Sequence, residues 1–201
     1  MKVFNSLTGK KEDLDSIQKG KISIYVCGMT VYDDCHIGHA RTFLSFDMIV
    51  RYLRSRNIKV DYIRNITDVD DKILQRAKEK NQEPSVLVDR YIERMTSDFN
   101  ALGMISPDKE PRATENIQII LDLISRLIEG GYAYHEGGDV YFSVESFPEY
   151  GKLSNQKMDE ILSGVRIEID KEKRNPADFV LWKKGDGNLA WDSPWGKGRP
   201  G

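Results

Sequence analysis

The sequence predicts an α/β fold built on a parallel sheet, and three successive patterns support this prediction. An apolar run at residues 22–26 indicates a first strand, and apolar residues at helical spacing follow it up to Arg54. Alternating apolar and polar residues over 58–66 indicate a second strand. A strand, a helix of about 15 residues and another strand form a βαβ unit, in which the two strands lie parallel.

Three helical patterns follow the first strand. The first ends near Asn57, the second covers residues 70–80, and the third runs from 85 to 102 with Gly103 as its end. We expect their apolar faces to pack against the rest of the fold. These faces consist of Phe43, Phe46, Ile49, Val50 and Leu53 in the first helix, and Val88, Tyr91, Met95, Phe99 and Leu102 in the third.

The clearest helical pattern begins at Thr114, a predicted N-cap, and ends at Gly130 and Gly131. Its apolar stripe is typical of a core-facing helix. The stripe consists of Ile117, Ile120, Leu121, Ile124, Leu127 and Ile128. After it, residues 132–135 and 140–144 flank a glycine-containing turn, which indicates a β-hairpin.

Composition is ordinary for a globular protein, with 39% hydrophobic and 31% charged residues among 201. The formal charge of −2 neither demands nor excludes a nucleic-acid partner. Without a signal-peptide pattern or an apolar stretch of ~18 residues, we expect a cytoplasmic protein without a membrane partner. Cys27 and Cys35 are not in a CxxC arrangement, which favours neither a disulfide framework nor a self-contained zinc knuckle.

The turn after the first strand leads to His36, Gly38 and His39 at the mouth of a helix. Gly38 permits close backbone approach, and the unpaired N–H groups and dipole of a helix start favour an anion. The two imidazoles, three residues apart, add side-chain donors on one face. This pattern indicates a phosphate site, although a pair of surface histidines or two metal ligands would have the same spacing.

Four segments together resemble one family. Residues 36–39 (HIGH) resemble the ATP-binding motif of class I aminoacyl-tRNA synthetases. Residues 27–33 (CGMTVYD), 64–72 (RNITDVDDK) and 173–183 (KRNPADFVLWK) resemble cysteinyl-tRNA synthetases in particular. These segments occur in order over essentially the whole chain, so we expect it to be the N-terminal part of such a catalytic domain.

The resemblance implies a Rossmann-like nucleotide-binding fold with an inserted segment. Residues 1–110 would form the first half of this fold, 111–170 the insertion, and 171–201 the truncated start of the second half. In the family, the remaining zinc ligands and the KMSKS loop lie further along the sequence. We therefore expect a fragment that is inactive by itself.

The expected chemistry is adenylate formation, in which the carboxylate of L-cysteine attacks the α-phosphate of ATP, supplied with Mg²⁺. Preorganised donors at a helix start suit the charge that develops on phosphorus, and His36 and His39 fit this catalytic role. The resemblance implies a wider set of ATP contacts, namely Met29, Thr30, Tyr32, His36, Gly38 and His39.

Recognition of the amino acid is expected beside this site. The resemblance implies that Cys27 is one ligand of a Zn²⁺ ion that captures the substrate thiolate, and that Gly28, Thr30 and Thr67 contact substrate cysteine. From the residues alone, Cys27 would also suit simple packing and Thr67 would suit a turn. Cys35 is not placed to complete the zinc site.

The remaining polar candidates have simpler interpretations. Asp68, Asp70 and Asp71 would suit a metal cluster, but capping of the following helix and pairing with Arg64 or Lys72 is favoured. His135 is expected to be exposed or packed.

The predicted function is that of a cysteine–tRNA ligase, with tRNA(Cys), L-cysteine and ATP as partners. Two alternatives stay open: an ATP-dependent ligase that joins cysteine to an amino sugar in mycothiol synthesis, and a non-catalytic nucleotide-binding module. The sequence does not indicate the oligomeric state.

Overall fold

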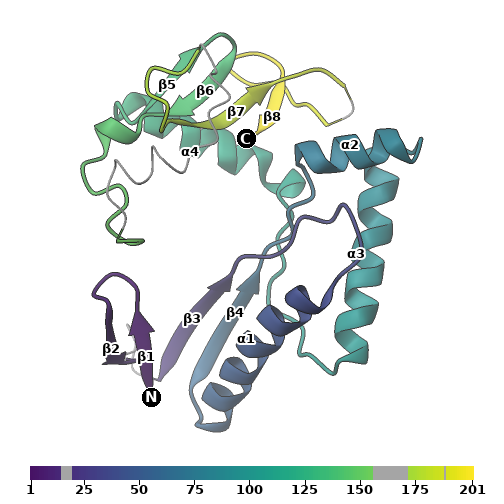
Figure 1. The fold of residues 1–201 in the computed structure, drawn as a ribbon, viewed down its shortest axis with the longest axis vertical. Helices are drawn as coiled ribbons and strands as arrows, with labels where there is room; N and C mark the ends of the chain where they lie inside the picture. The colour runs from purple at the N-terminus through teal and green to yellow at the C-terminus, as the bar shows by residue number, and fades with distance from the viewer. Residues whose placement is uncertain (15–19, 156–171, 188) are drawn as a thin grey trace. The chain divides into compact units, whose positions relative to one another are not determined.

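The computed structural model describes residues 1–14, 20–155, 172–187 and 189–201 (Figure 1). It divides into two compact units. One comprises Ser16–Asn116, and the other combines Met1–Asp15 with Ile117–Gly201. Both helices and sheets are present, as the coarse α/β prediction requires. No helix in these described ranges is long and apolar enough to cross a membrane.

The unit Ser16–Asn116 contains the predicted βαβ arrangement. Strand β3 (Lys21–Val26) pairs in parallel with β4 (Lys59–Arg64), from Lys21 opposite Lys59 to Val26 opposite Arg64. Helix α1 (Ile37–Ser55) connects them. At 19 residues it is longer than expected, because it begins directly after His36.

Helix α1 buries Phe43, Val50 and Leu53, but the expected apolar face is wrong at Ile49, which is 38% exposed. Asp47 is buried instead. Its carboxylate accepts the Arg51 Nε–H at 2.7 Å and the Ile105 N–H at 2.8 Å. These charge-assisted hydrogen bonds offset the cost of burying the carboxylate.

The other edge of β4 is occupied by the extended segment 108–113. The Arg64 N–H donates to the Lys109 carbonyl at 3.1 Å, and the Ile66 N–H donates to the Pro111 carbonyl at 2.9 Å. Strand β4 is therefore paired on both sides, and its residues Val60 and Tyr62 are buried, as is Ile66 just beyond its end.

Two further helices complete this unit, α2 (Asp71–Glu79) and α3 (Pro84–Ala101). The buried face of α3 was predicted correctly apart from Leu102, which lies beyond the helix end and is 48% exposed. Asp70 caps α2 as expected, since its side chain accepts the Lys72 N–H at 2.8 Å.

Asp68 does not pair with Arg64, which was one of the two partners expected for the group Asp68, Asp70 and Asp71. The Arg64 guanidinium binds the Glu110 carboxylate at 2.6 Å and lies over the rings of Phe43 and Phe99. Both carboxylate oxygens of Asp68 accept from Thr114, one from its N–H at 3.0 Å and one from its hydroxyl at 2.5 Å.

Thr114 is consequently not the N-cap of the next helix. It begins a 3₁₀ turn (Thr114–Asn116), and α4 (Ile117–Glu129) starts after this turn. The end of α4 was predicted correctly, with Gly131 at a φ of 76°. A positive φ of this size is readily adopted by glycine, which explains why the helix stops there.

The second unit contains a hairpin and a sheet. The hairpin pairs β1 (Lys2–Asn5) with β2 (Lys10–Asp13). The sheet is antiparallel in the order β5-β6-β7-β8, and the expected hairpin is its β5–β6 pair. A 3₁₀ turn (Val144–Ser146) follows β6. The bounds of the sheet strands are Ala133–Glu136, Asp139–Phe142, Phe179–Lys184 and Gly198–Pro200.

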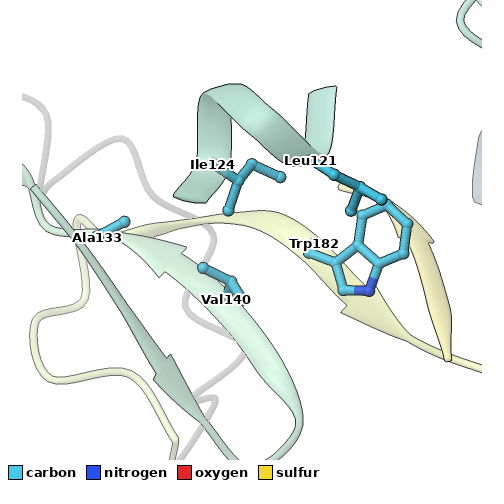
Figure 2. Close-up of a cluster of buried hydrophobic side chains, with 5 residues drawn as sticks. All are labelled: Leu121, Ile124, Ala133, Val140 and Trp182. Carbon is cyan, nitrogen blue, oxygen red and sulfur yellow. The ribbon is translucent and has the colours of Figure 1, made fainter. Parts of the chain in front are cut away.

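The core of this unit lies between α4 and the sheet. Figure 2 shows Leu121 and Ile124 of α4 beside Ala133, Val140 and Trp182 of the strands. Trp182 and Val140 are fully buried. The other stripe residues pack against this cluster, so the stripe is core as predicted. These residues are Ile117, Ile120, Leu127 and Ile128.

Candidate functional site

The segments that leave β3 and β4 stay side by side beyond the strand ends. Thr30 pairs with Thr67 in parallel register. The Thr67 N–H donates to the Met29 carbonyl, and the Val31 N–H donates to the Thr67 carbonyl, both at 3.2 Å. The carboxyl edge of a parallel sheet is where such folds bind ligands. The structure therefore brings together Thr30 and Thr67, which the sequence analysis placed in one substrate site.

Gly28 lies where the two strand ends approach most closely. Its N–H donates to the Asn65 side-chain oxygen at 2.7 Å. A Cβ atom at this position would come within 1.6 Å of the Asn65 carbonyl oxygen, so only glycine fits. Asn65 also donates from Nδ2 to the Thr67 hydroxyl at 3.3 Å. Sequence reasoning did not single out Asn65, because it placed this residue inside the predicted strand 58–66, whereas β4 ends at Arg64.

Cys27 follows β3 and is exposed. Cys27 is therefore not packed against the described part of the chain, and the strand before it is partly exposed as well, since Tyr25 is 63% exposed. Cys35 differs, because its Sγ lies 3.4 Å from the Met29 Sδ. Burial, together with Asp98 and Asp34, raises the pKa of the Cys35 thiol to about 11. Cys35 thus stays protonated at neutral pH and is a poor metal ligand.

His36 and His39 cap the start of α1 with their own side chains. The His36 Nδ1 accepts the Gly38 N–H at 3.1 Å, and the His39 Nδ1 accepts the His36 N–H at 3.2 Å. The expectation of unpaired N–H groups is therefore wrong at these two positions. A neutral imidazole whose Nδ1 accepts carries its proton on Nε2. Each ring can thus offer an Nε2–H donor.

Electrostatics favour the neutral form of His39. Burial lowers its pKa, and the neighbouring His36 lowers it further. The rings stack with their centroids 3.9 Å apart, which would bring two positive charges into contact if both were protonated. At neutral pH His39 therefore provides a hydrogen-bond donor without adding cationic charge.

The loop before His36 is fastened to the neighbouring helices. Asp33 pairs with Arg76 of α2 at 2.6 Å, and Asp34 pairs with Arg94 of α3 at 2.8 Å. The Lys72 ammonium lies 5.6 Å from the centre of the Tyr32 ring. These contacts hold in place the loop that presents the histidine pair.

Two other sequence candidates have different surroundings. Met29 is only 7% exposed, so its side chain faces the protein and any ligand contact would come from its backbone. His135 is exposed on β5, as one of its two expected interpretations had it. The remaining candidates all lie in the unit Ser16–Asn116. They are Cys27, Gly28, Thr30, Tyr32, His36, Gly38, His39 and Thr67.

Comparison with known proteins identifies the family of the chain. The family model described as tRNA synthetases class I (C) catalytic domain matches residues 13–201. The chain belongs to this family.

Curated relatives cover the whole chain. It is 58% identical over 203 aligned residues to a protein of Hahella chejuensis and 56% identical to one of Halorhodospira halophila. A protein of Shewanella sp. strain ANA-3 is 55% identical. All three are named cysteine–tRNA ligase, which confirms the family recognised from the sequence motifs. The chain spans 44% of the length of each of them.

The resemblance to the family implies a zinc ion, and Cys27 is the residue of this chain that would hold it. An exposed thiol such as that of Cys27 suits one ligand position of a zinc ion, which takes three protein ligands where a fourth position stays open for a substrate. The described residues contain no group of three or more His, Cys, Asp or Glu side chains placed to hold a metal. This result removes the metal-cluster interpretation of Asp68, Asp70 and Asp71. Among the described residues, Cys27 alone is then proposed as a zinc ligand.

Proposed function

We propose that this chain is the N-terminal part of a cysteine–tRNA ligase that converts L-cysteine and ATP into cysteinyl-adenylate and transfers the cysteinyl group to tRNA(Cys). The observation that carries the proposal is the placement of the paired Thr30 and Thr67 edge in one unit with the histidine-capped start of α1. The names of the relatives support the choice of cysteine.

This arrangement supports adenylate formation as the proposed first step. A carboxylate oxygen of cysteine attacks the α-phosphorus of ATP, the bond to the β-phosphate oxygen breaks, and pyrophosphate leaves with Mg²⁺. Negative charge builds up on the oxygens around phosphorus during this step. The Nε2–H groups of His36 and His39 are preorganised donors for that charge. Thr30, Tyr32, Gly38 and the Met29 backbone complete the proposed ATP contacts.

Selection of cysteine is proposed to take place at Gly28, Thr30 and Thr67, with Cys27 as one zinc ligand. Bound zinc would supply a soft acceptor that prefers the thiolate of cysteine over the hydroxyl of serine. The further zinc ligands would come from parts of the full-length protein outside the residues described. The exposed position of Cys27 next to Gly28 supports this assignment.

For the architecture, we propose that β3, α1 and β4 form the first βαβ unit of a Rossmann-like fold. Residues 1–110 would belong to its first half, 111–170 to an insertion, and 171–201 to the start of its second half. The change of structural unit between Asn116 and Ile117 lies near the first of these boundaries. The cytoplasmic location stays a prediction.

The proposal is tested with the full-length protein in an ATP–pyrophosphate exchange assay. Cysteine should support exchange, serine should support it much less, and tRNA(Cys) should become charged. His36→Ala and His39→Ala should each lower the exchange rate by about 10²–10³, with a much smaller effect on ATP binding. Cysteine-dependent exchange that charges an amino sugar instead of tRNA would favour the mycothiol alternative. If no amino acid supports ATP–pyrophosphate exchange, the interpretation as a non-catalytic nucleotide-binding module would remain.

A further inference from the structure

The side chain of Asn65 joins the ends of β3 and β4. Its Oδ1 accepts the Gly28 N–H at 2.7 Å, and its Nδ2 donates to the Thr67 hydroxyl oxygen at 3.3 Å. Since a backbone N–H can only donate, the amide oxygen must face Gly28. The orientation of the amide is therefore determined, and its NH₂ group faces Thr67.

This orientation affects what Thr67 can offer a ligand. An oxygen that already accepts from Asn65 has its own proton available to donate elsewhere. In an amino-acid substrate, the ammonium group only donates, whereas the carboxylate only accepts. The Thr67 proton can be accepted only by the substrate carboxylate, which is the reacting group in adenylate formation, whereas the ammonium could reach only the remaining lone pair of the hydroxyl oxygen.

The hydrogen bond between Asn65 and the Gly28 N–H lies beside Cys27, the proposed zinc ligand. Gly28 directly follows Cys27, and its close approach to the Asn65 backbone leaves no room for a side chain. The amide of Asn65 thus holds the backbone next to Cys27 and the hydroxyl of Thr67 at the same time. The Asn65 side chain therefore fixes the position of the Thr67 hydroxyl relative to the backbone next to Cys27.

We propose that Asn65 is a positioning residue of the amino-acid subsite, which turns the Thr67 hydroxyl toward the substrate carboxylate and fixes the backbone beside Cys27. This inference rests on the function proposed above. It assigns to Asn65 an effect on cysteine binding that is separate from ATP binding.

Asn65→Asp in the full-length protein tests the Thr67 contact while it keeps an acceptor for Gly28, and the negative charge that it adds near the substrate carboxylate acts in the same direction. This change keeps an acceptor for the Gly28 N–H but replaces the NH₂ group by a second acceptor. The Thr67 proton then turns toward the new carboxylate and is lost to the substrate. We expect the KM for cysteine to rise roughly tenfold, the KM for ATP to change less than about twofold, and the zinc content to stay unchanged.

Thr67 variants provide an independent measurement. Thr67→Val should raise the KM for cysteine as Asn65→Asp does, and Thr67→Ser, which keeps the hydroxyl, should restore it. The double variant Asn65→Asp with Thr67→Val should be no worse than Thr67→Val alone, because both changes remove the same interaction. These Thr67 variants keep the inference testable if the Asn65 variant does not fold.

Asn5 provides a matched control. In the hairpin, its Oδ1 accepts the Leu7 N–H and its Nδ2 donates to Glu12, both at 3.0 Å. Asn5→Asp should leave both KM values unchanged. The inference is overturned if Asn65→Asp behaves like this control, if it raises the two KM values equally, or if Thr67→Val has no effect. A wild-type protein without cysteine-dependent exchange would instead contradict the proposed function itself.

Discussion

The imidazole rings of His36 and His39 stack with their centroids 3.9 Å apart, and each Nδ1 accepts a backbone N–H at the start of α1. Protonation of either Nδ1 would remove an acceptor and place positive charge at the positive end of the helix dipole. The neutral pair is therefore the form that completes the helix start. The same form keeps both Nε2–H groups available as donors.

We predict that His39 titrates below the ordinary histidine value of 6.5, because burial and then His36 lower its pKa. For a base whose folded pKa is depressed, the unfolded chain binds the proton first as the pH falls. The stabilisation is therefore fully present above pH 6.5 and is lost as the pH drops from 6.5 toward the folded pKa. An NMR titration of the imidazole in the full-length protein measures this value.

Two variants control the histidine titration. His36→Gln removes the neighbouring charge but not the burial of His39, so the pKa of His39 should rise and still stay below 6.5. His39→Gln keeps an acceptor at the third helical position, as in a capping box, without a titrating group. The loss of folding stability as the pH falls below 6.5 should then be smaller than in the wild type. A pKa of 6.5 or above in the wild type would contradict the prediction.

Gly28→Ala should disrupt the site. The added Cβ would come within 1.6 Å of the Asn65 carbonyl oxygen, so the strand ends must separate. We expect a loss of stability of about 1–3 kcal/mol or more, together with loss of cysteine-dependent exchange. Gly185→Ala is the matched control, because a Cβ at that position meets nothing within 4 Å. Equal thermal stability and equal exchange in the two variants would show that the strand ends are not held as closely as described.

Leu121→Ala should destabilise the second unit far more than Leu123→Ala. Leu121 is 7% exposed in the cluster with Trp182, whereas Leu123 lies on the same helix and is 50% exposed. Removing the buried side chain should cost about 2–5 kcal/mol, and removing the exposed one about 0.5 kcal/mol or less. Denaturant unfolding of both variants measures the difference. Comparable losses would mean that α4 does not pack through the predicted stripe.

Sequence patterns predicted those parts of the fold that depend on local periodicity. The strand and helix order from β3 to β4 and the buried stripe of α4 follow from repeating apolar positions, and both are present. Asp47 shows where this reasoning fails. Its burial depends on a hydrogen bond from the Ile105 N–H, 58 residues away, which no local pattern encodes.

In the candidate site, too, local patterns were predictable from the sequence and long-range contacts were not. The position of His36 and His39 at a helix start was predicted from the glycine-containing turn, but their capping contacts depend on side-chain rotamers. Asn65 was missed because its partner Gly28 is 37 residues away in sequence. Thr114 was misassigned as an N-cap because its hydroxyl donates to Asp68, a long-range contact that overrides the local preference of threonine for caps.

The last prediction concerns Cys27 and the choice between cysteine and serine. The two substrates differ by one atom, and apolar contacts alone discriminate by only about 1–3 kcal/mol, whereas a zinc–thiolate bond can form with cysteine alone. Cys27→Ser in the full-length protein should therefore lower zinc retention, raise the KM for cysteine and shrink the preference over serine. Cys35→Ser is the matched control, since the Cys35 thiol is partly buried against Met29 and stays protonated. Metal analysis and exchange assays on both variants decide the matter. If Cys27→Ser keeps its zinc and its cysteine-to-serine ratio, Cys27 is not a zinc ligand and the selectivity must arise elsewhere in the protein.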